Sequence, residues 1–350
     1  MPVPSSGQIR ISDLVAEFGG SAPHALSEYY RNAGLVPSNN TNIPTSGQFS
    51  FSNAYGAVNE IAVAATSGAN IDISTLFGSN WTSTVPKRLT IGSGVTIGGT
   101  GSSAAIIIPS NMAGTLAIDN AGSIIGKGGA ANSGAGGNAI SNSASGVTIN
   151  NTGLLAGGGG GGGLGGVGGN GTFTTTTQTN HSPAYAGEGL PGGWTWRFYD
   201  PKVLTIRRNN GGYFYGAVRA DGASVTQIGN GFRSSYRGSD GYSYAYNWYE
   251  ESSSTSSSTG GSGGAGGRGQ GYNQTLASGS AGSSGGTNAG TGGTGGSGAA
   301  YGTAGSTGST GANGNSSNGS GGASGGAAGA AVTGTSVTMN NTGTLAGAVA

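Results

Sequence analysis

The sequence predicts a mainly β protein that combines short β-solenoid or sandwich rungs, a polyglycine II helix sandwich and a small α+β module at the N-terminus. Three observations lead to this fold class. Glycine makes up 79 of the 350 residues and returns at every third position in long runs. Residues 58–156 hold short apolar segments separated by Gly, Ser and Asn, as strands and turns do. The same β pattern resumes at residues 336–350, so the glycine-rich stretch leaves the β structure and returns to it.

Residues 1–57 predict the small α+β module. The stretch "ISDLVAEFGG" has the pattern of a short helix with Ser12 as its N-cap, and "ALSEYYRNAGLVP" repeats the design with Ser27 as the cap. An internal echo frames the pair, because Pro-Ser-Ser-Gly-Gln at 4–8 returns as Pro-Thr-Ser-Gly-Gln at 44–48. The module is too small to hold a substantial core alone, so we expect it to attach the chain to a partner.

Residues 58–156 predict a β-rich support domain built from repeats. The unit reads Ile-Asp-Asn-Ala-Gly at 118–122, Ile-Asn-Asn-Thr-Gly at 149–153 and Met-Asn-Asn-Thr-Gly at 339–343. Each unit supplies a strand, an Asn-rich corner, a Gly that tolerates positive φ, and a second strand. Such rungs are unstable alone and gain stability by stacking. We expect residues 336–350 to form a C-terminal rung that returns to the support domain.

The region 157–335 predicts glycine-rich left-handed helices. Glycine at every third position suits a helix with three residues per turn. Collagen also uses such a helix, but all ten prolines lie at or before Pro201, ahead of most of the strict glycine period. In polyglycine II the helices pack side by side, and only Gly allows that close backbone approach; Leu164 and Val167 would then project from one edge. The alternative is a flexible Gly/Ser linker. The main runs lie at 157–171, 260–271 and 285–329.

Residues 172–251 predict an inserted recognition segment within that region. They hold nine of the 14 tyrosines, three of the four tryptophans and seven of the 13 Lys and Arg residues. Aromatic residues and Arg dominate binding hot spots, and Tyr-Ser-Gly mixtures are typical of antibody paratopes. The candidate receptor-binding residues are Trp194, Trp196, Arg197, Tyr199, Tyr213, Tyr215, Arg233, Tyr236, Arg237, Tyr242, Tyr244, Tyr246, Trp248 and Tyr249.

Two further expectations concern this segment and its surroundings. Part of the insert could form a small β core, which we expect for Val203, Leu204, Ile206 and Val218. A shorter loop, "RGQGYNQTLAS" at 268–278, would be a second segment presented to the binding partner.

The composition argues against several classes of function. The charged fraction is 7% and the net charge is +1, whereas nucleic-acid binding requires a basic stripe. The chain has no cysteine, and its two histidines, His24 and His181, make neither a triad nor a metal site. Glu250 and Glu251 are adjacent, so on a strand they face opposite ways. We therefore expect no enzyme, cofactor or metal; the alternative is a polysaccharide depolymerase whose carboxylates converge in space.

The sequence also bears on location. The first residues lack the basic and apolar regions of a signal peptide, and no stretch approaches roughly 18 consecutive apolar residues. We therefore expect synthesis in a cytoplasm and export by another route.

Two stretches resemble a known group of proteins. "SGQIRISDLVAEFGG…LSEYY" looks like a short module that recurs in phage virion proteins. "TLAIDNAGSIIGKGG" followed by "GVTINNTGLLAGGGGGGG" resembles the lead-in to the polyglycine region of phage tail tip adhesins, which are similar to the receptor-recognising adhesins of T-even phage long tail fibres. In that family, glycine-rich motifs build a sandwich of polyglycine II helices, and loops at its distal tip bind outer-membrane proteins. The N-terminal module and the length of 172–251 depart from the simple T-even pattern.

The resemblance implies a non-enzymatic receptor-binding protein at the phage tail tip or distal tail fibre, released by lysis. Its partners would be a bacterial outer-membrane protein or surface glycan, and other tail or fibre proteins held through residues 1–57. It would be a homotrimer or a cap on a trimeric fibre. One alternative is a purely structural tail protein, whose aromatic segment is buried against a neighbouring subunit. Another is an ice-binding or matrix protein with one flat face of small residues.

Overall fold

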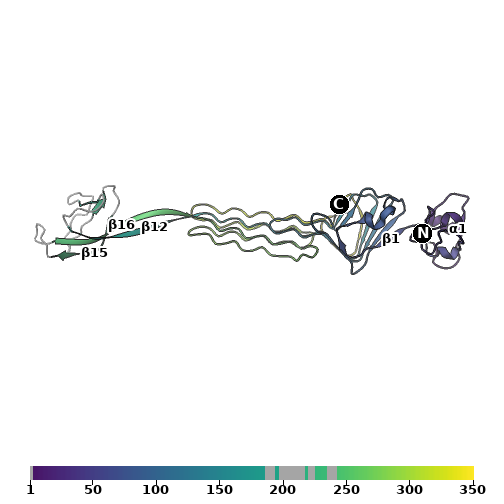
Figure 1. The fold of residues 1–350 in the computed structure, drawn as a ribbon, viewed down its shortest axis with the longest axis horizontal. Helices are drawn as coiled ribbons and strands as arrows, with labels where there is room; N and C mark the ends of the chain where they lie inside the picture. Colours follow the sequence, from purple (N-terminus) through teal and green to yellow (C-terminus); the bar gives the residue numbers. More distant parts are fainter. Residues whose placement is uncertain (1–2, 186–193, 197–216, 220–224, 235–242) are drawn as a thin grey trace. The chain divides into compact units, whose positions relative to one another are not determined.

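The computed structural model (Figure 1) describes five stretches of the chain, residues 3–185, 194–196, 217–219, 225–234 and 243–350. For the described residues within 178–252, it describes the backbone but not the side chains. The chain divides into two compact units, residues 1–171 with 259–350, and residues 172–258. The described elements are mostly strands with few short helices, which confirms the predicted mainly β fold. None of the described helices is long and apolar enough to cross a bilayer.

The N-terminal module has a small core of its own. It contains α1 (Ile11–Phe18) and the 3-10 helices η1 (Leu26–Tyr29) and η2 (Phe51–Ala54). One face of α1 is buried through Leu14 and Phe18, which is the amphipathic pattern expected of a surface helix. The buried apolar residues of the module are Val3, Ile9, Leu14, Phe18, Tyr29, Val36, Ile43, Ala54 and Ala57.

The helix caps differ from those predicted. Helix α1 begins at Ile11 with Arg10 at the N-cap, where the Asp13 carboxylate accepts a hydrogen bond from the Arg10 backbone N–H at 2.7 Å. Ser12 therefore lies inside the first turn. The second expected helix is the 3-10 helix η1, which follows Ala25, and Ser27 lies within it. In both cases an acidic side chain three residues after the cap satisfies a backbone N–H, a role that a Ser cap does not fill.

Three parallel sheets form the β body, which we define as residues 61–156 with 331–350. Each circuit of the chain adds a strand to successive sheets, so neighbouring strands come from successive repeats. The first sheet contains β1 (Ile61–Ala64), β4 (Lys87–Ile91), β7 (Leu116–Asn120), β10 (Val147–Asn151) and β18 (Thr338–Asn341). The second contains β19 (Thr344–Ala346), β11 (Leu154–Ala156), β8 (Ser123–Ile125), β5 (Thr96–Gly98) and β2 (Gly68–Ala69). The third contains β17 (Val332–Gly334), β9 (Ile140–Asn142), β6 (Ile106–Ile108) and β3 (Ile71–Asp72).

The core of the β body consists of rows of equivalent side chains. In β7 and β10 the first, third and fifth residues are buried, as the period of two in a strand requires. The parallel register places Leu89 beside Ile118, and Ile118 beside Ile149. The short helix α2 (Ile73–Phe77) and the 3-10 helix η3 (Gly78–Thr82) add Phe77 and Trp81 to this core.

The C-terminal residues pair with the earlier repeats. Strand β18 pairs with β10 so that Met339 lies beside Ile149, and β19 pairs with β11. The Asn at the end of each strand forms a second row, because Asn120 Nδ2 donates to Asn151 Oδ1 at 2.7 Å and Asn151 Nδ2 donates to Asn341 Oδ1 at 2.6 Å. These bonds satisfy the buried Nδ2 groups of Asn120 and Asn151, where an unpaired donor would be costly, while Asn120 Oδ1 has no hydrogen-bond partner within the described residues.

One charged side chain lies inside the β body. Lys87 is only 1% exposed, and its neighbours across the sheet are Ile61 and Leu116. Its Nζ donates to the backbone carbonyls of Ser83 at 2.6 Å, Val85 at 3.0 Å and Ala113 at 2.7 Å. Burial lowers the pKa of Lys87. The side chain thus fastens two loops at one end of the sheet.

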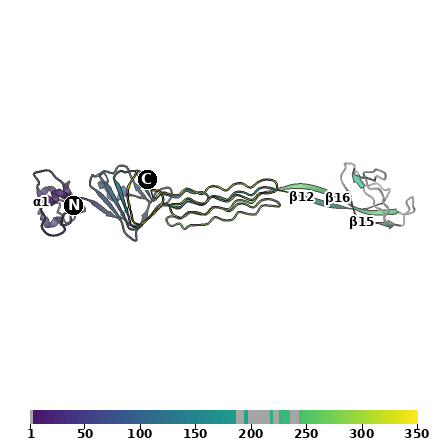
Figure 2. The ribbon, with the colours of Figure 1, turned by 180° about the vertical axis from the view of Figure 1, so that it is seen from behind.

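The glycine-rich region consists of extended segments that run side by side (Figures 1 and 2). We refer to six of them as the glycine segments, at 157–170, 260–270, 275–285, 289–299, 303–314 and 318–330. Hydrogen bonds join them at every third residue. Backbone N–H groups of Gly159, Gly162 and Gly165 donate to the carbonyls of Gln270, Gly267 and Gly264 at 2.8–2.9 Å.

The segment 157–170 is the most enclosed of the six. The N–H groups of Gly160, Gly163, Gly166 and Gly169 donate to segment 303–314, and segment 157–170 accepts bonds from 289–299 and 318–330. A Cβ on Gly162 would lie 1.8 Å from the carbonyl oxygen of Gly296, so no larger residue fits. Leu164 and Val167 are 42% and 50% exposed, because every third position faces outward. From Leu164 to Asn170 the two residues between each outward position are therefore glycine, and the glycines at 157–163 are all buried.

The loop at 268–278 is placed differently from the prediction. Its turn, Gly271–Gln274, lies against the β body, with the Tyr272 N–H donating to the Gly126 carbonyl at 3.0 Å. A Cβ on Gly98 would lie 2.0 Å from Cγ of Tyr272, so the ring packs directly on β5. The Gln274 side chain accepts a hydrogen bond from the Gly128 N–H at 2.6 Å. The turn therefore anchors the glycine segments on the β body.

The second unit is described mainly through its strands. Strands β12 (Gly171–Tyr185), β16 (Ser243–Ser258) and β15 (Val225–Ser234) form one sheet in that order. Strand β13 (Trp194–Trp196) pairs with β14 (Ala217–Arg219) in antiparallel fashion. Near the start of the insert, the hydroxyls of Thr176 and Ser253 lie 3.1 Å apart.

We predict that Gly162→Ala strongly destabilises the glycine segments, because the new methyl group overlaps a backbone carbonyl that cannot move alone. The expected loss is about 1–3 kcal/mol of unfolding free energy or more, measured by urea denaturation. Gly321→Ala is the matched control, since a Cβ there meets nothing within 4 Å. Equal stability of the two variants would contradict the close packing.

We predict that Lys87→Met lowers the free energy of unfolding by about 1–3 kcal/mol, because three backbone carbonyls lose their donor. Thermal unfolding of the purified variant measures this. Lys127→Met serves as the control, because Lys127 is only half-buried and its side chain makes no hydrogen bond within the described residues. If both variants melt at the wild-type temperature, Lys87 is not a fastening residue.

Candidate functional site

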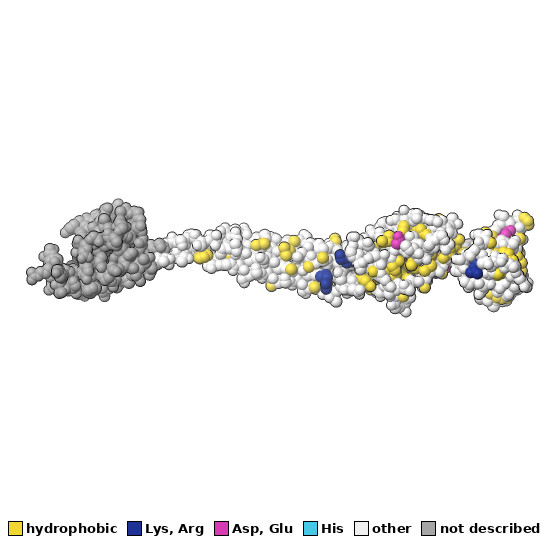
Figure 3. Space-filling model, in the orientation of Figure 1, with side chains coloured by type: hydrophobic (Ala, Val, Ile, Leu, Met, Phe, Trp, Pro, Cys, Tyr) yellow, Lys and Arg dark blue, Asp and Glu magenta, His cyan; other side chains and the backbone are white. Residues whose placement is uncertain are grey.

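The described part of the chain offers little catalytic chemistry. It contains no group of three or more His, Asp or Glu residues that could hold a metal ion. His24 Nδ1 lies 3.3 Å from the Tyr29 hydroxyl and 3.7 Å from Glu28 Oε2, inside the N-terminal module. The face in Figure 3 carries few charged side chains, with apolar ones gathered over the β body.

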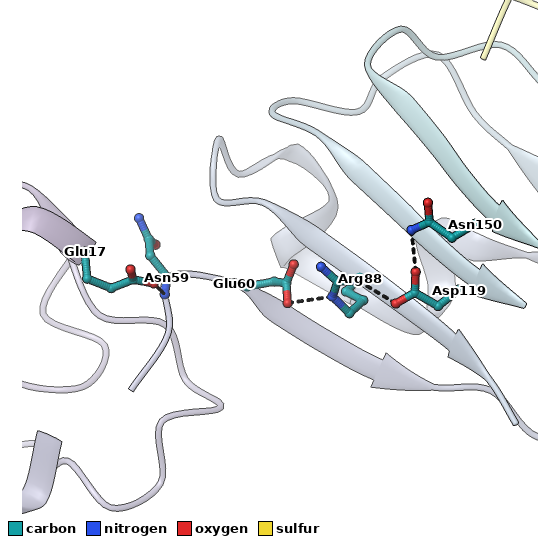
Figure 4. Close-up of polar contacts among 6 residues, drawn as sticks. All are labelled: Glu17, Asn59, Glu60, Arg88, Asp119 and Asn150. Atoms are coloured by element: carbon teal, nitrogen blue, oxygen red, sulfur yellow. Dashed lines mark hydrogen bonds and ion pairs between the residues drawn. The ribbon is translucent and has the colours of Figure 1, made fainter. Parts of the chain in front are cut away.

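The main charged cluster is a ladder across the first sheet (Figure 4). Arg88 Nε donates to Glu60 Oε2 at 2.9 Å, and Arg88 Nη1 donates to Asp119 Oδ2. Asn150 Nδ2 donates to Asp119 Oδ1 at 2.6 Å, and Asn340 Nδ2 donates to Asn150 Oδ1 at 2.9 Å. Successive members come from neighbouring strands, so the ladder ties the repeats together on their outer face.

The ladder is built for structure and not for acid–base chemistry. Hydrogen bonds to Glu60 and Asp119 raise the pKa of Arg88, so it stays charged. Burial by itself would raise the pKa of Asp119, but the hydrogen bonds from Asn150 and Arg88 outweigh burial and leave that pKa below its ordinary value of 3.8. A general acid needs a raised pKa near neutral pH, and this carboxylate has the opposite shift.

A group of exposed polar residues lies where the glycine segments turn. We call it the turn cluster: Asn170, Gly260, and residues 286–290 and 313–319. Asn170 is its centre, because its carbonyl accepts bonds from the N–H groups of Ser316 at 3.1 Å and Ser317 at 3.3 Å. The Asn170 N–H donates to Ser317 Oγ at 2.8 Å, and its Oδ1 accepts from the Gly260 N–H at 3.2 Å.

The two turns of this cluster contact each other. The Asn315 N–H donates to the Asn288 carbonyl at 3.0 Å, and Asn288 adopts a left-handed φ of 58°, which Asn tolerates better than most residues. The exposed side chains are uncharged amides and hydroxyls, namely Thr287, Asn288, Asn313, Asn315, Ser316, Ser317 and Asn318. Such a surface can bind a ligand only through neutral hydrogen bonds.

The inserted segment begins and ends at this cluster. Strand β12 starts at Gly171, directly after Asn170, and β16 ends at Ser258, just before Gly260. The glycine segments that lead into and out of the insert, 157–170 and 260–270, are paired with each other next to this cluster, where the Gly168 N–H donates to the Gly261 carbonyl at 2.8 Å. Any residue of the insert is therefore connected to the scaffold through the turn cluster.

The structure describes only part of the predicted receptor-binding set. Seven of these residues lie outside the described residues: Arg197, Tyr199, Tyr213, Tyr215, Tyr236, Arg237 and Tyr242. Val203, Leu204 and Ile206 of the expected small core also lie outside them, and Val218 is on β14.

The remaining candidates lie on strands. Trp194 and Trp196 are the two ends of β13, and Arg233 is on β15, opposite Tyr244 of β16. Tyr244, Tyr246 and Trp248 occupy alternate positions of β16, and Tyr249 is opposite Thr226. The backbone thus brings one predicted arginine and four predicted aromatic residues to a single strand pair.

Two groups were missed by the sequence reasoning. The turn cluster had a signal, because "NGNSSNG" is dense in the residues that favour turns. The charged ladder had a weaker one: Arg88, Asp119 and Asn150 are spaced by 31 residues, which is the length of one repeat. Neither signal identifies the contacts without the register of the sheets.

Comparisons with known proteins define the class first. Residues 59–258, more than half of the chain, match the family described as phage tail fibre adhesin Gp38. A solved structure, the gp37-gp38 adhesin tip complex of the bacteriophage S16 long tail fiber, is similar with a TM-score of 0.36 and 19% sequence identity over 97% of this chain and 97% of that chain. No curated protein matches.

The chain therefore belongs to the phage tail fibre adhesin Gp38 family. Family membership places it in the tail of the virion, with a structural or receptor-binding role and not an enzymatic one. It also implies participation in host attachment.

We predict that the charged ladder makes stability fall in acid. The folded pKa of Asp119 lies below the ordinary value of 3.8, so as the pH falls the unfolded chain takes up a proton first. The contribution of the ladder is complete above about pH 5 and is lost as the pH falls through the folded pKa. Urea unfolding between about pH 2 and pH 6 measures this slope.

Asp119→Asn is the variant for comparison. It is less stable than the wild type at neutral pH, and the difference shrinks in acid. A difference that is constant across this pH range would show that the ladder is not the cause.

Proposed function

We propose that this chain is the receptor-binding protein at the tip of a phage tail fibre and that segment 172–251 recognises the host surface. The observation that carries the proposal is the placement of this aromatic-rich insert between two arms of a glycine scaffold. The scaffold itself is nearly free of charge, and no Asp, Glu, Lys, Arg or His follows Arg268. Specific recognition needs rigid aromatic and Arg anchors, and outside the β body and the N-terminal module the insert supplies most of them.

We further propose that the glycine segments form a sandwich of polyglycine II helices. The support is the repeat of three in their hydrogen bonds and the buried glycines of segment 157–170. Cα–H···O contacts of about 0.5–1 kcal/mol each would add to the N–H···O bonds. Such a stack is stiff and would not have the conformational freedom of a Gly/Ser linker.

The predicted division of labour is part of the proposal. Residues 1–57 would attach the chain to the tail or fibre, and 58–156 with 336–350 would form the support. The core buried by the N-terminal module and its contact with the next segment, where the Asn59 N–H donates to Glu17 Oε1 at 2.6 Å (Figure 4), fit a module fixed to that support. The receptor would be an outer-membrane protein or a surface glycan, and the oligomer a homotrimer or a single cap on a trimeric fibre.

Adsorption competition tests the function. Host cells are mixed with the purified chain before phage are added, in parallel with a variant in which residues 172–258 are replaced by a short Gly-Ser turn. The intact chain is expected to block adsorption, and the shortened chain is not. The replacement is structurally mild because the two arms are already hydrogen-bonded to each other at Gly168 and Gly261.

Substitutions within the insert refine the test. Tyr244→Ala with Tyr246→Ala and Trp248→Ala removes three predicted anchors, and competition is expected to weaken at least tenfold. Thr174→Ala with Thr176→Ala near the base of the same sheet is the control. If neither the intact nor the shortened chain competes although both are folded, the purely structural alternative holds. Turnover of host polysaccharide would instead support the depolymerase.

A further inference from the structure

The N-terminal module contains a duplicated loop that its own packing does not explain. The loops are residues 4–8, Pro-Ser-Ser-Gly-Gln, and residues 44–48, Pro-Thr-Ser-Gly-Gln. Their glycines, Gly7 and Gly47, have the same left-handed φ of 85°. Each loop is followed by a helix whose first turn is closed in the same way, by Asp13 for the first loop and Asn53 for the second. The two copies therefore share their fold as well as their sequence.

Each loop is clamped by a tyrosine from the other half of the module. The Tyr55 hydroxyl donates to the Gly7 carbonyl at 2.5 Å, and the Gly56 N–H donates to the Pro4 carbonyl at 3.1 Å. Tyr55 is the residue that directly follows η2.

The second loop is held by the same pair of contacts. The Tyr30 hydroxyl donates to the Gly47 carbonyl, and the Arg31 N–H donates to the Pro44 carbonyl at 3.0 Å. Tyr30 directly follows η1. Each half of the module thus holds the loop of the other half, through one tyrosine hydroxyl and one backbone N–H. The two loops are therefore equivalent and rigid.

The shared residues divide into two groups. The glycines, the tyrosines and the apolar pairs Ile9 with Phe49 and Ile11 with Phe51 are explained by backbone conformation and by the core. Ser6 with Ser46 and Gln8 with Gln48 are all exposed, and within the described residues their side chains make no hydrogen bond. Packing places no demand on these four side chains, yet both loops carry the same ones.

We infer that the two loops are a bivalent docking surface for two adjacent subunits of a homo-oligomeric virion protein. The inference rests on the proposed attachment through residues 1–57. A duplicated, rigid, exposed motif fits a partner that offers the same surface twice. The loops carry no charge, so recognition uses the Gln amides and Ser hydroxyls, and binding is insensitive to salt. Two linked contacts also bind far more tightly than one, because the second is intramolecular.

The test uses purified phage particles assembled without this chain. The purified full-length chain is added, and the amount bound per particle is measured by quantitative immunoblot. Gln8→Ala and Gln48→Ala are each expected to weaken binding about tenfold, and the double variant about a hundredfold or more. Binding of the wild type is expected to change little between about 50 mM and about 500 mM salt.

Ser38→Ala with Asn39→Ala is the matched control, because these exposed residues belong to the same module but to neither loop. Wild-type binding by the double Gln variant, or an effect of one loop alone, would overturn the inference. The inference would also be overturned if the double Gln variant lost self-association of this chain, measured by light scattering, because the loops would then bind a second copy of the chain. Melting temperatures of all variants are expected to match, since the Gln side chains are exposed and make no hydrogen bond within the described residues.

The result is separable from the proposed function. Binding of the purified chain to host cells is measured in parallel with the same variants, and the double Gln variant is expected to retain it. If the wild type binds the particles but not the cells, the receptor-binding proposal fails and the docking loops stand.

Discussion

The structure depends on backbone-to-backbone contact between glycine segments. A Cβ on Gly158 would lie 1.7 Å from the carbonyl oxygen of Lys127, and one on Gly260 would lie 1.8 Å from that of Gly168. Segments at this separation exchange N–H···O bonds directly, without side chains between them. Ordering glycine is costly in entropy, and the regular bonds are what offsets it. The scaffold is therefore held by hydrogen bonds where an ordinary domain relies on an apolar core.

A scaffold of this kind needs a template at one end, and the β body supplies it. Strands β8 and β11 run directly into the first glycine-rich residues, so the register of the sheets is carried into the glycine segments. The Gly126 N–H donates to the Ala156 carbonyl at 2.8 Å, and the Gly157 N–H donates to the Ala346 carbonyl at 2.9 Å. The last of these contacts uses the C-terminal rung, which brings the chain back to the start of the glycine-rich region. Tyr272 then fixes the returning turn on Gly98.

The repeats and the glycine period made much of this foreseeable. The Asn-Asn-Thr-Gly units predicted stacked rungs, and Leu164 and Val167 predicted one outward position in three. The caps at Ser12 and Ser27 were wrong, because both helices begin one residue before these serines, and Asp13 and Glu28 accept from the N–H groups of the residues that are the N-caps, Arg10 and Ala25. The loop at 268–278 was misplaced, since nothing in "GYNQ" tells which end of a hairpin it occupies. Lys87 was not anticipated either, because only the parallel register puts it between Ile61 and Leu116. The aromatic site itself remains a prediction.

The contact between Asn170 and Gly260, where the insert leaves and rejoins the scaffold, has an evolutionary consequence. The insert enters and leaves the scaffold at neighbouring positions, and the glycine segments on either side of it are hydrogen-bonded to each other, as Gly168 N–H is to the Gly261 carbonyl. Recombination could therefore replace the whole of 172–258 by a segment of another length without altering the register of any glycine segment. The insert is thus an exchangeable segment, and on the proposed function a lineage could change its target by replacing it while the rest of the chain stays the same.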